Sequence, residues 1–208
     1  MFPMPITHTF LDMFIGRYPK ITLIGMSGLG KSHWSKELEN YGYKRLCCDD
    51  AIADRLQRLG GNGKIADLGK WMGFPDDPQY TSREKTYLSL EIQVLHEFVE
   101  RLAKAAPGEK IVTDTTGSAP YAGDALMNRL GRHSCIIYLA ASSEYHSEML
   151  ARYIRCPRPV LWGDKFRPKP SESKEDALAR CYGELLIYRH KLYKKHAHYT
   201  VPYEAHRV

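Results

Sequence analysis

Residues 20–32 read KITLIGMSGLGKS, and this stretch decides how the rest of the chain is interpreted. Ile21–Ile24 is a short apolar run bounded by glycine, which is typical of a buried strand. The next eight residues contain three glycines, a lysine and two serines, of which Ser32 follows the lysine. Trp34 and Leu38 then lie four residues apart, the spacing of one face of a helix. The stretch therefore predicts a strand, a glycine-rich turn and a helix in immediate succession.

The turn fits the pattern G-x-x-x-x-G-K-[ST], the P-loop, whose backbone N–H groups surround phosphate oxygens at the start of a helix. Glycine makes this possible because it adopts backbone angles that other residues avoid. We expect Lys31 to reach the β- and γ-phosphates of ATP and Ser32 to hold Mg²⁺. The candidate nucleotide-binding residues are Gly25, Met26, Ser27, Gly28, Leu29, Gly30, Lys31 and Ser32.

Further apolar runs alternate with helical patterns along the whole chain. Such alternation indicates a parallel sheet with helices on both faces. We therefore expect one domain over residues 1–208 with a three-layer α/β/α P-loop kinase fold and a five-stranded parallel sheet. The predicted strands are 21–24, 43–48, 110–113, 135–140 and 199–201. The predicted helices cover 51–60, 121–131 and 143–155, with longer ones starting at the capping residues Thr81-Ser82 and Ser173.

Two irregular segments interrupt this alternation. Residues 60–80 carry five glycines and two prolines, and we expect them to form a small substrate-binding insertion. Residues 152–172 are rich in proline and basic residues and predict a mobile lid. An arginine that closes over phosphates stabilises the charge of phosphoryl transfer, and Arg158, between two prolines, is the candidate. Arg152 is a candidate nucleotide contact. The remaining basic residues, interpreted as a solvated surface, are Arg155, Lys165, Arg167 and Lys169.

Three aspartates follow apolar runs. Asp49 and Asp50 come after the second predicted strand, and Asp114 ends the third in Ile-Val-Thr-Asp, which is typical of a Walker B aspartate. Ligands of parallel sheets gather at the carboxyl ends of the strands, so we expect these acids to converge with Lys31 in one cleft. Asp49 and Asp114 join Ser32 as candidate Mg²⁺ ligands. The alternative for each aspartate is to cap the helix that follows.

Beyond the P-loop, the sequence resembles the shikimate kinase family over most of its length. The similarity rests on Asp50, eighteen residues after Ser32, on Arg83, on Arg-Pro-Val-Leu at 158–161 and on Arg189-His190-Lys191-Leu192-Tyr193. The resemblance implies transfer of the γ-phosphoryl group of ATP to a hydroxyl of a small anionic metabolite. It implies that Asp50 orients or deprotonates the hydroxyl, and that Arg83 and Arg189 pair with an anionic group. Lys31, Asp50 and Arg158 are then the catalytic candidates.

The chain also departs from the family. Thr115-Thr116-Gly117 stands where the family has three glycines, which makes Thr116 and Gly117 candidate acceptor contacts, and the family's first aspartate falls on Cys48. These departures leave two alternatives open. One is a nucleotide-binding ATPase or regulatory protein without a small-molecule acceptor. The other is a nucleoside or nucleotide kinase, whose candidate base-stacking residues are Trp71, Phe74 and Tyr80.

Composition limits the partners. The 208 residues carry a formal net charge of +6, but the basic residues form no long run, which argues against nucleic acid. Five cysteines show neither disulfide-framework nor zinc-ligand spacing, so we expect reduced thiols. No signal-peptide or membrane-spanning pattern is found. We expect a cytoplasmic monomer or weak homodimer.

Overall fold

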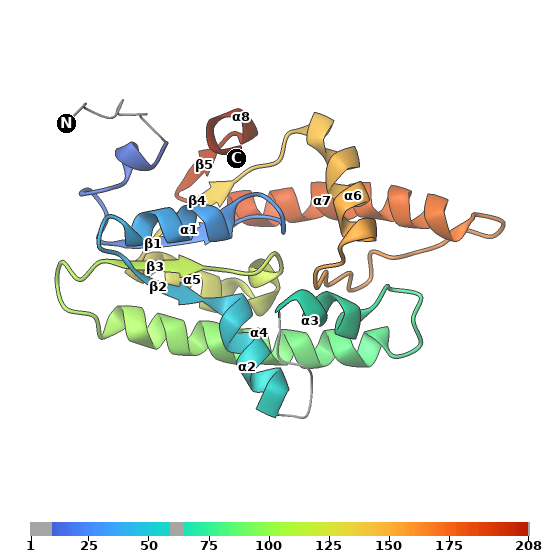
Figure 1. Cartoon of the computed structure of the whole chain (residues 1–208), viewed down its shortest axis with the longest axis horizontal. Coiled ribbons are helices and arrows are strands. Elements are labelled where there is room, and N and C mark those ends of the chain that lie inside the picture. Colours follow the sequence, from blue (N-terminus) through green and yellow to red (C-terminus); the bar gives the residue numbers. More distant parts are fainter. Residues whose placement is uncertain (1–9, 59–64, 208) are drawn as a thin grey trace, which may run out of the picture.

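The parallel sheet predicted from the apolar runs is present and complete. A computed structural model describes residues 10–58 and 65–207. Its five strands form one sheet in the order β2-β3-β1-β4-β5, and every neighbouring pair is parallel (Figure 1). The strands are β1 (Lys20–Ile24), β2 (Lys44–Cys47), β3 (Ile111–Asp114), β4 (Cys135–Leu139) and β5 (Tyr199–Val201).

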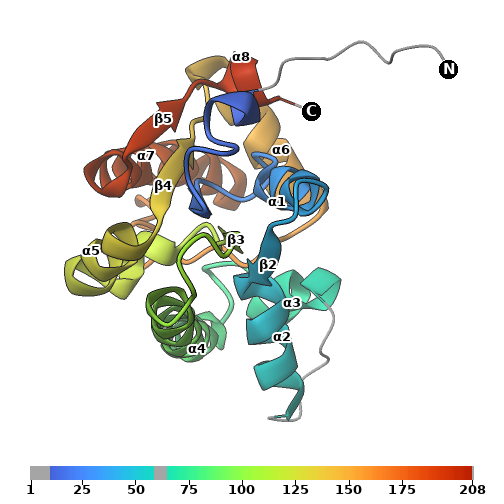
Figure 2. The ribbon, with the colours of Figure 1, turned by 90° about the vertical axis from the view of Figure 1, so that its left-hand side faces the viewer.

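Helices connect the strands and cover both faces of the sheet, which confirms the three-layer α/β/α architecture (Figures 1 and 2). None of the described helices combines the length and hydropathy that a bilayer span requires. The α-helices are α1 (Lys31–Glu39), α2 (Cys48–Arg58), α3 (Ile65–Met72), α4 (Tyr80–Ala103), α5 (Asp124–His133), α6 (His146–Arg155), α7 (Lys174–His196) and α8 (Tyr203–His206). Short 3₁₀ turns are η1 (Phe10–Met13), η2 (Ala119–Ala122) and η3 (Ser143–Tyr145).

Alternate residues of the strands enter two separate apolar cores. Ile21 and Leu23 of β1 belong to one core with Trp34 and Leu38 of α1, whereas Ile24 belongs to the other. Figure 2 shows α1 on one side of the sheet and α4 and α5 on the other. Both faces of the strands are therefore buried, which is why the strands read as continuous apolar runs.

The two longest helices start in different ways. Ser173 caps α7 as predicted, because its Oγ accepts a hydrogen bond from the Asp176 backbone N–H at 3.1 Å. The predicted cap of α4 at Thr81-Ser82 is wrong: α4 already begins at Tyr80, and Thr81 and Ser82 lie in its first turn. Asp77 orders the approach instead, accepting the Gln79 backbone N–H at 2.8 Å.

The predicted insertion and lid contain more regular and buried structure than their composition suggests. The insertion includes helix α3, while its residues 60–64 lie outside the described residues. The lid begins with the last turns of α6 and continues as irregular chain to residue 173. Within it, Val160, Leu161 and Trp162 are buried, so the lid is anchored where we expected a mobile loop. The Tyr80 hydroxyl secures this anchor by donating to the Val160 carbonyl at 2.7 Å and accepting from the Trp162 N–H at 2.9 Å.

Candidate functional site

The glycine-rich turn between β1 and α1 exposes unpaired backbone donors. Gly25 has φ 144°, and a Cβ there would lie 2.6 Å from the Leu139 carbonyl oxygen, so only glycine fits. Gly30 adopts the left-handed conformation directly before α1. In the described chain, no backbone N–H from Met26 to His33 has a hydrogen-bond acceptor. The turn therefore offers a run of free amides at a helix N-terminus, the arrangement that binds phosphate.

Lys31 is held at the base of this turn. Its ammonium donates to the Gly25 and Met26 carbonyl oxygens at 2.8 and 2.9 Å. Burial lowers the pKa of Lys31, and the nearby carboxylates of Asp114 and Asp49 oppose that shift. The lysine thus supplies a partly desolvated positive charge next to the free amides.

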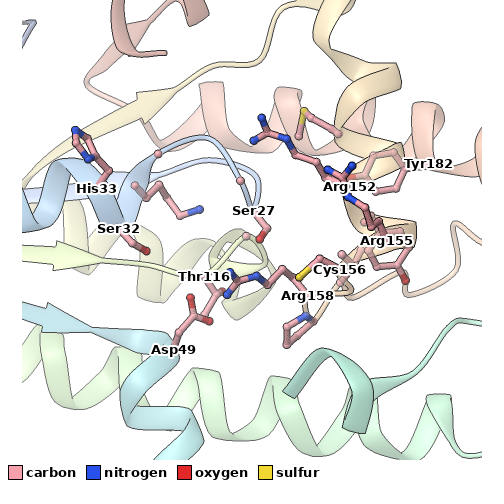
Figure 3. Close-up of a pocket in the computed structure, with 18 of the residues that line it drawn as sticks. Ser27, Ser32, His33, Asp49, Thr116, Arg152, Arg155, Cys156, Arg158 and Tyr182 are labelled. Atoms are coloured by element: carbon pink, nitrogen blue, oxygen red, sulfur yellow. The ribbon is translucent and has the colours of Figure 1, made fainter. Parts of the chain in front are cut away.

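A cavity of about 520 Å³ opens at the carboxyl ends of the strands, between the glycine-rich turn and the lid (Figure 3). Its size suits a small-molecule ligand. Its walls come from the turn and α1, from the starts of α2 and α4, from the turn after β3, and from α6 with the lid. The lining residues are Ser27, Gly28, Gly30, Lys31, Ser32, His33, Asp49, Tyr87, Thr116, Gly117, Tyr145, Met149, Arg152, Tyr153, Arg155, Cys156, Arg158, Pro159, Val160 and Tyr182.

The acid in the cavity is Asp49, not Asp50. Asp49 accepts a hydrogen bond from the Tyr87 hydroxyl at 3.2 Å, and burial raises its pKa, although Lys31 and Arg158 lower it in part. The Asp50 side chain is 53% exposed, lies outside the cavity and pairs with Arg45 at 3.4 Å. The reason is geometric: α2 starts at Cys48, and successive helical residues point about 100° apart. The predicted role of Asp50 at the acceptor is therefore not supported by its position.

Asp114 also lies away from the cavity. Its side chain is 1% exposed, and its Oδ2 accepts from Arg45 at 2.6 Å and from the Ser35 hydroxyl at 3.1 Å. Its Oδ1 is buried without a hydrogen-bond partner in the described chain. Arg45 reaches it because Cys47 and Asp114 are register partners in neighbouring strands. The predicted Mg²⁺ ligand is thus neutralised by an arginine that the sequence analysis did not single out.

The turn after β3 is fixed by a buried carboxyl group that the sequence analysis missed. Thr116 and Ser118 both donate hydrogen bonds to Glu91 of α4, the latter at 2.7 Å, and the Ser118 N–H donates to the Thr116 hydroxyl at 3.1 Å. Glu91 is fully buried, and burial raises its pKa to about 8, against the hydrogen bond from Ser118. The sequence could have indicated Glu91, because it is an acidic residue within the apolar stripe of a predicted helix, four residues after Tyr87.

The lid contributes three arginines to the cavity. Arg158 is exposed and extends toward Asp49 and Thr116 (Figure 3). Arg152 pairs with Glu148 at 2.6 Å and lies over the ring of Tyr145, 5.4 Å from its centroid. Together with Lys31 and Arg155, these residues make the cavity wall strongly cationic.

The candidate aromatic residues of the insertion do not line the cavity. The Phe74 ring packs edge-on against Tyr153 at 5.3 Å between centroids, and Trp71 also packs against the core. The Tyr80 hydroxyl is bonded to the lid backbone. These side chains pack against the core and the lid, and they lie outside the cavity.

Comparisons with known proteins add to this geometry. No protein-family model and no curated protein sequence matches the chain. Among solved structures, the shikimate kinase from Acinetobacter baumannii in complex with shikimate aligns with a TM-score of 0.58 and 24% identity, covering 91% of this chain and 86% of that one. The shikimate kinase from Bacteroides thetaiotaomicron aligns with a TM-score of 0.56 and 20% identity over 88% and 86%.

The chain has a shikimate kinase-like fold. At these identities the likeness establishes the fold alone. Two arginines that the family resemblance assigned to an acceptor anion, Arg83 and Arg189, do not line the cavity.

Arg189 of α7 is 1% exposed and does not line the cavity. Its guanidinium donates to the carbonyl oxygens of Gly117, at 2.9 Å, and Leu161. It also donates to the Tyr121 hydroxyl at 3.2 Å and lies 3.3 Å from the Met26 sulfur. Its donors therefore connect the glycine-rich turn, the turn after β3 and the lid, and are not directed at a ligand.

Arg83 lies on the first turns of α4 and is likewise outside the cavity. It pairs with Asp77 at 3.6 Å and donates to the Gln79 side chain. The structure therefore brings together Lys31, Asp49 and Arg158 of the predicted site. It leaves Arg83 and Arg189 outside the lining of the cavity.

Proposed function

We propose that the protein is an ATP-dependent phosphotransferase that moves the γ-phosphoryl group of ATP to a hydroxyl group of a small molecule. One observation carries the proposal: a single cavity is lined by the glycine-rich turn with its free backbone amides, by Lys31 and by the carboxyl group of Asp49. The amides and Lys31 suit phosphate, and the carboxyl group suits a hydroxyl donor. The shikimate kinase-like fold supports this assignment.

The nucleotide end is built for a triphosphate. The free amides of residues 26–33 supply donors for phosphate oxygens, and Lys31 exchanges its two carbonyl partners for them. Arg152 and Arg155 extend the cationic wall along the lid. Of the candidate Mg²⁺ ligands, Ser32 lies on the glycine-rich turn side of the cavity and lines it. Bound Mg²⁺ supplies charge neutralisation between the phosphates.

Asp49 takes the role that the sequence analysis gave to Asp50. Its Oδ1 is bonded to Tyr87, and its Oδ2 has no donor in the described chain, so it can accept the hydroxyl proton of an acceptor. Burial raises the pKa of Asp49 toward the range in which a carboxylate works as a general base. Arg158, beside it, stabilises the charge of the transferred group.

The decisive experiment follows phosphoryl transfer from γ-labelled ATP to a panel of hydroxylated compounds. Lys31→Ala should reduce transfer by roughly 100-fold or more, since it removes a charged donor at the transferred group. Lys36→Ala, an exposed residue on the same helix, is the matched control and should leave the rate unchanged. Slow ATP hydrolysis that no compound accelerates would favour the ATPase or regulatory alternative instead.

A further inference from the structure

The acceptor end of the cavity presents the carboxyl group of Asp49 and the turn after β3, and among the lining arginines Arg158 extends toward it (Figure 3). We propose that its acceptor is an uncharged polyhydroxy compound, such as a sugar or a cyclitol, and not a carboxylic acid. The proposal rests on the kinase function above and adds the chemical class of the substrate. The residues that carry it are Asp49, Tyr87, Thr116, Gly117 and Arg158, all of which line the cavity.

The first step is that the turn after β3 separates Arg189 from the cavity. A Cβ on Gly117 would lie 3.1 Å from the Ser27 backbone nitrogen and 3.5 Å from Arg189 Nη1. Gly117 is therefore wedged between the glycine-rich turn and the guanidinium. Since Arg189 already donates to the Gly117 and Leu161 carbonyl oxygens, a ligand carboxylate could reach it only by displacing this backbone.

The second step concerns the groups that remain exposed to an acceptor. Asp49 has one oxygen bonded to Tyr87 and a second without a donor in the described residues. A ligand hydroxyl can donate to that free oxygen, whereas a ligand carboxylate would be repelled by it. Behind the wall, the carboxyl group of Glu91 accepts the hydrogen bond of Thr116 and so holds the turn after β3 in place. The wall thus favours hydroxyl groups.

The third step is the distribution of positive charge. Arg158 extends toward Asp49, so its charge is partly matched by that carboxylate (Figure 3). Lys31 belongs to the glycine-rich turn, and Arg152 and Arg155 belong to α6. A triphosphate with its several negative charges matches these cations. No further cation among the lining residues is left to pair with an acidic acceptor.

The test uses the full chain, γ-labelled ATP with Mg²⁺, and acceptors supplied in matched sets. Each set shares one linear or cyclic carbon skeleton and consists of the polyol, the corresponding monocarboxylic acid and the phosphomonoester. We expect kcat/KM for the polyol to exceed that for the acid by at least ~10-fold in the set that reacts best, because like charges repel at Asp49. A higher kcat/KM for the acid or the phosphomonoester would overturn the proposal and leave the kinase function standing.

Arg83→Gln provides the control variant, because Arg83 pairs with Asp77 outside the cavity. It should leave the ratio of kcat/KM between polyol and acid unchanged; a selective rise in the KM of the acid would restore Arg83 as a carboxylate-binding residue and overturn the proposal. Calorimetry with ATP and Mg²⁺ distinguishes a failure of the proposed substrate class from a failure of the proposed kinase function. Nucleotide binding with no transfer to any member of any set defeats the kinase function itself, and this inference with it.

Discussion

Neighbouring aspartates at the end of β2 meet different surroundings because α2 starts at Cys48. Asp49 turns into the cavity, where Tyr87 donates to it. Asp50 turns to the surface, where Arg45 pairs with it at 3.4 Å. The two residues are chemically identical, so replacing each in turn isolates the effect of position on catalysis.

Asp49→Asn should reduce phosphoryl transfer by roughly 100-fold or more, since it removes a proton acceptor while keeping the shape of the side chain. Asp50→Asn should change the rate by less than about 3-fold, because an exposed ion pair contributes little. Steady-state transfer assays on both variants measure the difference. Equal losses in the two variants, or a larger loss for Asp50→Asn, would return the acceptor role to Asp50.

Glu91 shows how much a buried acid can couple folding to pH. Burial raises its pKa in the folded protein to about 8 from an ordinary value of 4.5. Between these values the unfolded chain releases the proton while the folded protein retains it. The unfolded state therefore binds fewer protons, and the free energy of unfolding falls as the pH rises.

Replacing Glu91 by Gln should remove this dependence. The difference in the free energy of unfolding between Glu91→Gln and the wild-type protein at pH 4 serves as the reference. At pH 8 this difference should have shifted in favour of the variant by about 4 kcal/mol. Urea unfolding at several pH values measures the trend. Glu97→Gln on the exposed side of α4 serves as the control. A pH-independent difference for Glu91→Gln would show that Glu91 does not titrate in this window.

At the scale of elements, α3 and the lid approach each other closely enough to exclude any side chain. A Cβ on Gly69 would lie 1.9 Å from the carbonyl oxygen of Pro157. The insertion therefore supports the lid by backbone contact. A larger side chain at position 69 would force the lid out of this position. The insertion acts on the cavity through the lid, since none of its described residues lines the cavity directly.

Gly69→Ala should lower the free energy of unfolding by about 1–3 kcal/mol, because the added methyl group forces the lid and α3 apart. The matched control is Gly183→Ala in α7, where a Cβ meets no atom within 4 Å. That variant should gain up to about 1 kcal/mol from helix propensity. Urea denaturation shows whether each substitution lowers or raises the free energy of unfolding. Stabilisation by both substitutions would mean that the lid moves away from α3 without cost.

The elements were predictable where local chemistry defines them. β5 matches its predicted span, and β3 and β4 end within one residue of theirs, because apolar runs bounded by polar residues locate a buried strand. The start of α4 was missed because Gln79 gives no side-chain capping bond. The lid was misjudged because its prolines and charges conceal Val160, Leu161 and Trp162, whose burial depends on α4 and α7.

At the scale of the whole molecule, Arg189 joins segments that are distant in sequence. Its guanidinium contacts Met26, Gly117, Tyr121 and Leu161, which belong to the glycine-rich turn, the turn after β3, η2 and the lid. In the sequence Arg189 was interpreted as a ligand contact, because the stretch Arg189-His190-Lys191-Leu192-Tyr193 resembles the shikimate kinase family. Only the packing of α7 against these four segments distinguishes a structural arginine from a ligand-binding one, and no local pattern encodes that packing.

Arg189→Met should lower the free energy of unfolding by about 2–4 kcal/mol, since it leaves buried carbonyl oxygens without their charged donor. Arg129→Met, which removes an arginine from a partly exposed ion pair with Glu100, should cost less than about 1 kcal/mol. Thermal and urea unfolding measure both. A fully stable Arg189→Met protein with a selectively raised acceptor KM would instead support a substrate-binding role.

The anchored lid has a spectroscopic consequence. The indole of Trp162 is 1% exposed and is surrounded by the rings of Tyr153, Phe166 and Tyr182. Lifting this segment transfers the indole into water, which shifts its fluorescence emission to longer wavelength. Trp34 lies in the other core, across the sheet, and keeps its surroundings during such a motion. In a Trp71→Phe background, where Trp34 and Trp162 are the remaining tryptophans, the emission wavelength therefore reports each opening of the cavity.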